Sequence, residues 1–166
     1  MTTDKRLISL SVNGELQAKI IEPRMSLADF LRIELELTGT HVGCESGVCG
    51  ACTVNINGQT ARACTMLAVQ VEGDEVTTIE GASESGEFRD LQDAFHARNA
   101  LQCGFCTPGM LMMSAELLTQ NSKPCRQEIR EYLSGNYCRC TGYEAIVDAV
   151  ETVAQTRNAR VGEQDD

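Results

Sequence analysis

The stretch Gly43-Cys44-Glu45-Ser46-Gly47-Val48-Cys49-Gly50-Ala51-Cys52 places three thiols within nine residues and interleaves them with three glycines. Glycine tolerates a positive φ, so a loop of this kind can fold back and direct its backbone N–H groups at sulfur. A further cysteine, Cys64, follows with eleven residues between it and Cys52, beyond an Asn57-Gly58 turn. The residues therefore predict a loop wrapped around a compact metal centre, with Cys64 returning as a ligand from the neighbouring strand.

The first cysteine group consists of Cys44, Cys49, Cys52 and Cys64. Its C-x4-C-x2-C run with a distant fourth cysteine is the spacing of plant-type ferredoxins, which hold a 2Fe–2S cluster. Zinc is the alternative, but zinc loops usually present paired C-x2-C knuckles, and this group has only one. A Rieske-type centre needs two histidine ligands, and neither His41 nor His96 has the spacing for it. We expect each histidine to be an ordinary polar or capping residue.

The second cysteine group consists of Cys103, Cys106, Cys138 and Cys140. Its C-x2-C and C-x-C pairs are separated by 31 residues, and each precedes a predicted helix start, at Pro108 and at Thr141. Helix N-termini stabilise negative charge and lower thiol pKa values. An anionic iron–sulfur cluster fits this position, although by spacing alone a zinc site or a redox dithiol is an open alternative.

The ninth cysteine, Cys125, falls where a serine or threonine would normally cap a helix, and Glu128 follows three residues later. We expect it to be a poor N-cap rather than a metal ligand.

Hydrophobic periodicity predicts a small sheet in the first half of the chain. Residues 6–22 and 53–63 alternate apolar and polar side chains about Asn-Gly turns, which predicts two hairpins. Residues 76–79 are expected to form a last short strand. Between the hairpins, Ser26 and Asp29 form a capping box for a helix extending to about Leu37.

The second half of the chain changes to helical periodicity after residues 81–87, which we interpret as a connector. Four helices are expected: one around 91–95, one over 107–118, one over 126–133 and one beginning at Thr141. The predicted fold is α+β, with an N-terminal β-grasp (plant-type ferredoxin-like) domain and a C-terminal four-helix bundle. The predicted domains are residues 1–82 and 83–156, each holding one 2Fe–2S cluster, followed by a disordered polar tail, 157–166.

Composition narrows the class of protein. The net charge of −10, from 14 basic and 24 acidic residues, argues against nucleic acid and favours a protein partner. Residues 1–12 include Asp4, Lys5 and Arg6 without a long apolar run, so we expect neither a secretory signal nor a membrane span. We therefore predict a cytoplasmic protein, whose thiols in a reducing compartment would hold metal rather than form disulfides.

Three motifs, at 43–54, 102–109 and 136–143, resemble those of the iron–sulfur small subunit of the xanthine oxidase family of molybdenum hydroxylases. This family includes carbon monoxide dehydrogenase and the N-heteroaromatic and aldehyde dehydrogenases with separate subunits. The resemblance runs from the first hairpin to the last helix. At position 125 relatives commonly carry a hydroxyl residue, so Cys125 departs from the family pattern.

The resemblance implies two partners: a large subunit with a molybdopterin-type molybdenum cofactor and a medium FAD subunit, assembled as a dimer of heterotrimers. It implies that the first cysteine group binds the 2Fe–2S cluster near the flavin. The second group would bind the cluster near the molybdenum cofactor, where Gln102 and Cys140 would lie beside the pterin. The substrate-binding pocket would belong to the large subunit.

The implied function is electron transfer, one electron at a time, from the molybdenum subunit through both clusters to a flavin or another acceptor. In the family, the substrate is oxidised at molybdenum with water as the oxygen source, and we find no active site in this chain. A free-standing two-cluster ferredoxin-type carrier is the alternative, but a lone carrier needs no second helical domain. A two-site zinc-binding module is a third, and it would be colourless.

Overall fold

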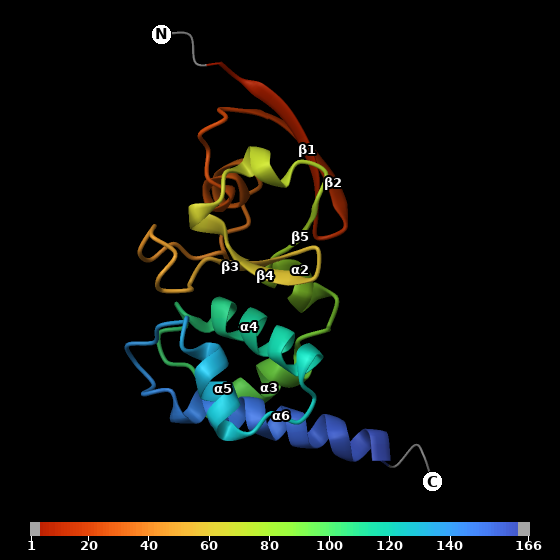
Figure 1. The fold of residues 1–166 in the computed structure, drawn as a ribbon, viewed down its shortest axis with the longest axis vertical. Helices are drawn as coiled ribbons and strands as arrows, with labels where there is room; N and C mark the ends of the chain where they lie inside the picture. Colours follow the sequence, from red (N-terminus) through yellow and green to blue (C-terminus); the bar gives the residue numbers. More distant parts are fainter. Residues whose placement is uncertain (1–3, 163–166) are drawn as a thin grey trace.

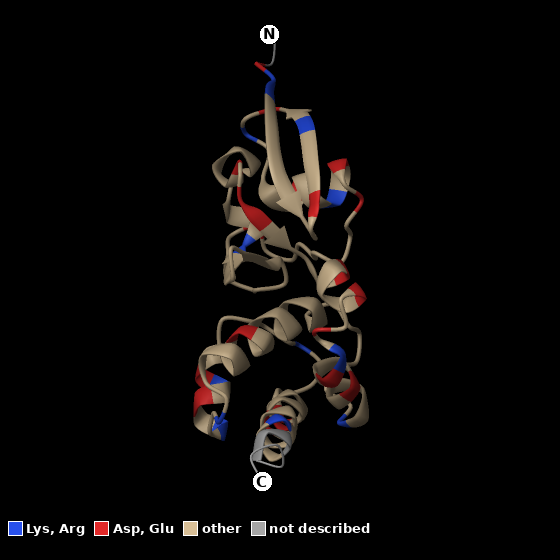
Figure 2. Ribbon diagram, turned by 90° about the vertical axis from the view of Figure 1, so that its right-hand side faces the viewer, with Lys and Arg blue, Asp and Glu red and all other residues tan. Residues whose placement is uncertain are grey.

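The computed structural model describes residues 4–162, which form an elongated molecule with a sheet domain at one end and a helical domain at the other (Figure 1). Acidic residues occur on both domains (Figure 2), so the negative net charge is not confined to one of them. Among the described helices, none combines the length and the apolar character needed to cross a bilayer.

The sheet has five strands in the order β2-β1-β5-β3-β4. They are β1 (Arg6–Val12), β2 (Glu15–Ile21), β3 (Thr53–Ile56), β4 (Gln59–Arg62) and β5 (Glu75–Thr77). β1 pairs parallel with β5, and the remaining pairs are antiparallel. Both predicted hairpins are confirmed, because at each Asn-Gly turn both residues have positive φ, as a type I′ turn requires.

A helical segment packs across the sheet through Leu27, Phe30 and Leu31, all fully buried. It comprises α1 (Leu27–Asp29) and a π-helical turn, η1 (Phe30–Glu34). The N-cap half of the predicted capping box is confirmed, since Ser26 Oγ accepts the Asp29 N–H at 3.0 Å, while the Asp29 carboxylate accepts from the Ser26 hydroxyl at 2.8 Å. The helix ends at Glu34 rather than near Leu37, because Glu36 adopts a positive φ of 58° and turns the chain out of the helix. Two short 3₁₀ turns follow β4, η2 (Ala63–Thr65) and η3 (Ala68–Val71).

The helical domain contains α2 (Ile79–Glu84), α3 (Arg89–Ala97), α4 (Thr107–Gln120), α5 (Arg126–Leu133) and α6 (Glu144–Gly162). Helices were expected in the last four places, and the α+β architecture is confirmed. The prediction of a connector at 81–87 was wrong over α2, where Ala82 is buried in the helical core. Six residues, three of them Gly, Ala or Ser, are too few to show a hydrophobic period.

The last helix differs from the prediction at both ends. α6 begins at Glu144 rather than Thr141, and it continues to Gly162. The expectation of a disordered tail was therefore wrong over 157–162, while residues 163–166 lie outside the described part of the chain. Arg157 forms a bidentate ion pair with Asp90 of α3, at 2.7 and 2.9 Å, which attaches the end of α6 to the bundle.

Two separate hydrophobic cores support the two halves of the molecule. Ile8, Leu10 and Val54 are buried in the sheet domain, and Met110, Ile129 and Val150 are buried in the helical one. α4 lies against β3 and β4, as Figure 1 shows. The junction between the domains is therefore formed by the β3–β4 hairpin and by the helix that begins directly after Cys106.

Candidate metal centres

The first cysteine group gathers at the end of the sheet domain that faces the helices. The β3–β4 register pairs Thr53 with Arg62, so Cys52 and Cys64, which flank this hairpin, lie beside each other. The Cys64 N–H is directed at Cys52 Sγ, 3.5 Å away. In the loop, the N–H groups of Ser46 and Cys49 both point at Cys44 Sγ, at 3.4 Å. The sequence prediction that Cys64 returns from the neighbouring strand agrees with this geometry.

The electrostatics of this group suit bound cations. Hydrogen bonds from Ser46 and Cys49 lower the pKa of the Cys44 thiol to about 6. Burial, together with the proximity of the Cys64 and Cys49 thiols, raises the pKa of Cys52 to about 11. Neighbouring thiolates repel one another, so crowded thiols do not readily ionise together. A bound metal cation offsets this repulsion, and a thiol that coordinates a metal is deprotonated.

The second cysteine group gathers where two loops meet, the loop before α4 and the loop before α6. The Sγ atoms of Cys103 and Cys140 lie 3.5 Å apart. Burial, and then the nearby Cys138 and Cys103 thiols, raise the pKa of Cys106 to about 12. This group is therefore crowded in the same way as the first.

Thr141 directs both of its donors at Cys138 Sγ, the N–H at 3.4 Å and the hydroxyl at 3.2 Å. Burial opposes ionisation of Cys138, but these hydrogen bonds outweigh it and lower the pKa. α6 does not begin at Thr141, because Gly142 and Tyr143 adopt positive φ of 65° and 70°, which a right-handed helix does not allow. Cys106, rather than Thr107, is the N-cap of α4.

Each group of four thiols, with N–H or hydroxyl donors pointing at sulfur, fits a 2Fe–2S cluster, for which four cysteines are the usual ligands. None of the nine cysteines forms a disulfide. In the described part of the chain, no three His, Cys, Asp or Glu side chains are arranged as they would be around one metal ion. Cys125 is at the N-cap of α5, where Glu128 accepts its N–H at 2.7 Å, and this agrees with the prediction of a capping position.

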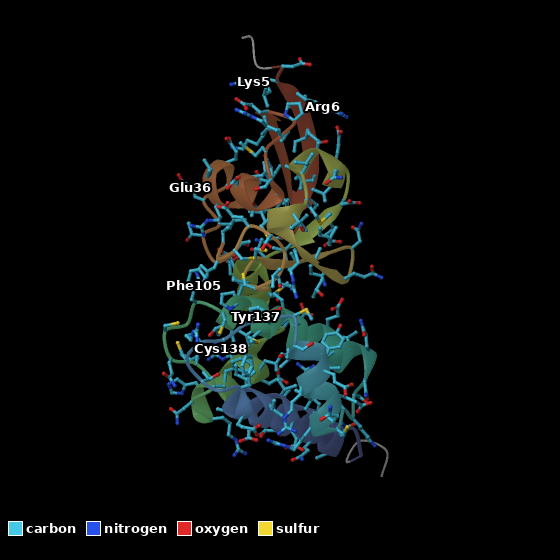
Figure 3. All side chains as sticks on the ribbon, turned by 60° about the vertical axis from the view of Figure 1, so that its left-hand side comes forward. Lys5, Arg6, Glu36, Phe105, Tyr137 and Cys138 are labelled. Atoms are coloured by element: carbon cyan, nitrogen blue, oxygen red, sulfur yellow. The ribbon has the colours of Figure 1, made fainter. Side chains whose placement is uncertain are left out.

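Two contacts join the cysteine loops of the two domains. The Tyr137 N–H donates to the Cys49 carbonyl at 2.8 Å. His41 Nδ1 donates to the Phe105 carbonyl at 2.8 Å, and the two rings stack with centroids 4.7 Å apart. Figure 3 labels Phe105, Tyr137 and Cys138 at this junction. The role of His41 was missed, because nothing in the sequence pairs it with a residue 64 positions away.

Glycine permits this close approach. Gly50 has a φ of +75°, and a Cβ there would overlap the side chain of Asn136 and crowd the Gly135 carbonyl. A Cβ at Gly109, in the first turn of α4, would overlap the Gly50 carbonyl. Asn136 is 1% exposed, and its amide nitrogen and oxygen have no hydrogen-bond partner among the described residues. The two loops are therefore packed backbone to backbone.

Gln102 and Cys140 lie together on the outer side of the second group. Gln102 Nε2 donates to the Cys140 carbonyl at 3.0 Å, and both residues are exposed. The structure thus brings together the two residues that the resemblance had assigned to contact with the pterin.

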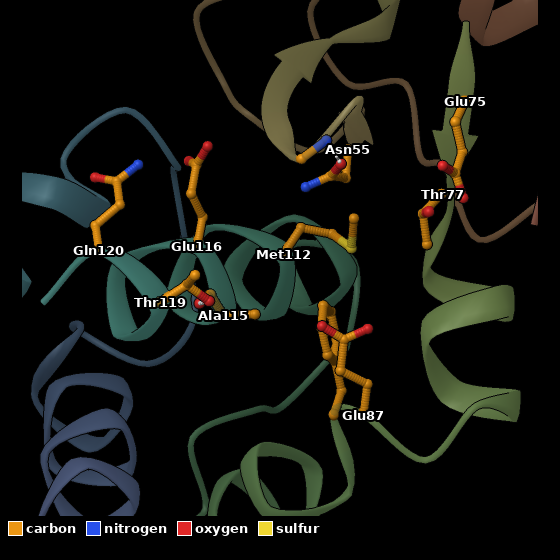
Figure 4. A pocket seen from close by; sticks show the side chains of 11 residues that line it. Asn55, Glu75, Thr77, Glu87, Met112, Ala115, Glu116, Thr119 and Gln120 are labelled. Carbon is orange, nitrogen blue, oxygen red and sulfur yellow. Dashed lines mark hydrogen bonds between the residues drawn. The ribbon is translucent and has the colours of Figure 1, made fainter. Parts of the chain in front are cut away.

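A pocket of about 340 Å³ opens at the domain junction, between the strands and α4 (Figure 4). Glu116 lines it and accepts hydrogen bonds from the N–H and hydroxyl of Thr60, at 2.7 and 2.5 Å, and from the Tyr132 hydroxyl at 2.6 Å. Partial burial raises the pKa of Glu116, but these hydrogen bonds and the charge of Arg62 outweigh it, so the pKa is below its usual value. One carboxylate thus connects β4, α4 and α5.

Comparison with known proteins agrees with this geometry. Residues 17–95 match a 2Fe-2S iron-sulfur cluster binding domain, and residues 78–151 match a second 2Fe-2S binding domain. The chain is 50% identical over 163 residues to caffeine dehydrogenase subunit gamma of Pseudomonas sp. strain CBB1, covering 95% of this chain and 96% of the relative. It is 48% identical to the nicotine 6-hydroxylase small subunit of Paenarthrobacter nicotinovorans, covering 89% of each.

Solved structures give the same result. Quinoline 2-oxidoreductase from Pseudomonas putida 86 contains a chain with a TM-score of 0.88 and 50% identity, covering 96% of this chain and 98% of that one. Aldehyde oxidoreductase from Desulfovibrio gigas gives a TM-score of 0.84 and 39% identity over 93% of this chain, which matches only 17% of that longer polypeptide. The resemblance inferred from the three motifs is confirmed: the chain belongs to the molybdenum hydroxylase family, as an iron–sulfur electron-transfer small subunit with two 2Fe–2S-binding domains.

Proposed function

We propose that this chain passes single electrons from a molybdenum subunit through two 2Fe–2S clusters to a flavin subunit or another acceptor. The ligands of the first cluster would be Cys44, Cys49, Cys52 and Cys64. The ligands of the second would be Cys103, Cys106, Cys138 and Cys140. We keep the predicted division into two cluster domains, residues 1–82 and 83–156, but propose that the boundary lies at the start of α2, since Ala82 is buried in the helical core, and that α6 extends the second domain to Gly162.

The observation that carries this proposal is the hydrogen bond from the Tyr137 N–H to the Cys49 carbonyl, 2.8 Å long. Cys49 is a proposed ligand of the first cluster, and Tyr137 directly precedes Cys138, a proposed ligand of the second. A continuous route therefore runs from the Cys138 thiolate through the backbone to Tyr137, across the hydrogen bond, and on to the Cys49 thiolate. When bound, the clusters would supply the one-electron chemistry, and this backbone hydrogen bond would hold their two ligand loops together.

The exposed pair of Gln102 and Cys140 supports entry of electrons at the second group. A partner that approaches this surface would reach a cluster ligand and the carboxamide oxygen of Gln102 without displacing either core. We propose that the partners are a large molybdopterin subunit there and a medium FAD subunit near the first group, assembled as a dimer of heterotrimers. Names such as "subunit gamma" and "small subunit" among the relatives support a multisubunit enzyme.

The relatives also suggest a substrate class for the whole enzyme. The names at 48–50% identity refer to caffeine, nicotine and quinoline, which are N-heterocycles, whereas the aldehyde oxidoreductase is 39% identical. We therefore propose that the partner subunit hydroxylates an N-heteroaromatic compound.

Purification of the native complex tests the electron-transfer proposal. We expect about four irons per chain, visible absorption, and two distinct EPR signals after dithionite reduction, because each group of four cysteines holds a two-iron cluster. Elution with larger subunits is expected on size exclusion. A monomer would favour the free-standing carrier, a colourless protein with zinc would favour the zinc module, and a single EPR signal at full iron content would contradict the proposal.

A further inference from the structure

Arg62 lies between the two cysteine groups. It is the last residue of β4, two positions before Cys64, and its side chain is half-buried. The guanidinium donates to the hydroxyl of Thr53, the residue that follows Cys52. It also donates to the carbonyl of Gly135, three positions before Cys138, at 3.0 Å. One side chain thus contacts the backbone segments that carry ligands of both proposed clusters.

The contacts of Arg62 extend toward the first group. The Thr53 hydroxyl in turn donates a hydrogen bond to the Gly50 carbonyl at 2.6 Å, and Gly50 is next to Cys49. A chain of hydrogen bonds therefore crosses the domain junction, from Gly135 through Arg62 and Thr53 to Gly50. It lies close to the bond between Tyr137 and Cys49.

The acceptors of this guanidinium are neutral. Within residues 4–162, Arg62 has no carboxylate partner at ion-pair distance. The charge of Arg62 contributes to lowering the pKa of Glu116, but the two side chains do not form an ion pair. A guanidinium stays protonated in proteins, so a full positive charge is held at the junction over the working pH range.

We propose that Arg62 is a positioning residue for electron transfer, whose fixed charge raises the reduction potentials of both clusters and whose hydrogen bonds hold their loops together. This inference rests on the proposed function. Reduction of a cluster adds one electron and hence one negative charge, which a nearby cation in a partly dry environment stabilises. The effect is expected to be larger on the first cluster, because Arg62 is two positions before Cys64 and contacts the residue after Cys52, whereas its contact with the second group is to Gly135, three positions before Cys138.

The test compares Arg62→Gln and Arg62→Lys in the purified complex, by redox titration followed by EPR. Arg62→Gln removes the charge, so both midpoint potentials are expected to become more negative, with the larger change at the first cluster. Each tenfold fall in the equilibrium constant of a one-electron reduction is about 59 mV. Arg62→Lys keeps the charge and is expected to retain most of the potential. Arg62→Met, which keeps the aliphatic part of the side chain, is a second neutral variant with the same expectation as Arg62→Gln.

Arg6→Gln is the matched control. It makes the same exchange of guanidinium for amide at an exposed ion pair with Glu72, at the end of the molecule away from Tyr137 and Cys138 (Figure 3). Both potentials are expected to be unchanged in this variant. The proposal is overturned if the neutral variants leave both potentials at the Arg6→Gln values, or if Arg62→Lys shifts them as far as Arg62→Gln.

Failure of this inference is distinguishable from failure of the proposed function. If the parent complex lacks two EPR signals, the two-cluster function itself is wrong. If the parent and every variant show both signals with unmoved potentials, only the role of Arg62 is wrong.

Discussion

Replacing Gly50 by alanine tests the packing of the two cysteine loops. The φ of Gly50 is +75°, and a left-handed conformation costs a residue with a side chain about 1–2 kcal/mol. The new Cβ would also overlap the Asn136 side chain and crowd the Gly135 carbonyl. Overpacking of this kind costs about 1–3 kcal/mol. The total is roughly 2–5 kcal/mol of folding free energy, lost at the contact between the domains.

Gly58→Ala is the matched control, because Gly58 has a φ of +88° but no atom within 4 Å of the added Cβ. Gly58→Ala has only the cost of the left-handed backbone, so the two variants differ by the overpacking cost of about 1–3 kcal/mol. At about 2–4 °C per kcal/mol for a chain of this size, the melting temperature of Gly50→Ala should be roughly 2–12 °C lower than that of Gly58→Ala. The assay is the loss of cluster absorption when the purified complex is heated, with the magnetic interaction between the reduced clusters as a second readout. Equal melting temperatures and equal magnetic interaction in the two variants would refute the close packing.

Three further predictions follow from side chains. Glu116→Gln should cost about 1.5–3 kcal/mol, the range for hydrogen bonds to a charged group, and should lower the melting temperature. Because the pKa of Glu116 is lowered from 4.5, its ionised form stabilises the fold above that pH; the gap between parent and variant should shrink as pH falls below 4.5, and a constant gap would contradict this. Thr141→Val removes the hydroxyl that points at Cys138 Sγ, so redox titration should show a more negative potential for the second cluster only. Cys125→Ser should gain up to about 1 kcal/mol from a better N-cap; iron analysis should show no loss of metal, and a loss would make Cys125 a ligand.

The sequence was most informative where structure depends on neighbouring residues. The Asn57-Gly58 turn determines the β3–β4 register, and this register places Cys52 and Cys64 side by side, as the cysteine spacing required. The helices α3 to α6 were visible from their apolar side chains, because these pack into the core, whereas α2 was too short to be recognised. Cys106 is the second cysteine of a C-x2-C pair, and it is positioned as the N-cap of α4.

The contacts between the domains were not predictable in this way. Arg62, Glu116 and His41 each contact a residue more than fifty positions away, so no local pattern identifies their partners. Thr141 was assigned to the helix start because a threonine there usually caps a helix, but the positive φ of Gly142 and Tyr143 delays the helix to Glu144. The sequence could predict two cluster sites, but their separation depends on packing that only the structure describes.

The bond between Tyr137 and Cys49 consists of main-chain atoms on both sides. Any amino acid other than proline at position 137 still provides the N–H, and every amino acid at position 49 still provides the carbonyl. Substitutions at these two positions therefore keep the donor and the acceptor of this hydrogen bond, as long as the loops stay in place. Tyr137→Pro is the one exchange at either position that removes the bond by its covalent structure.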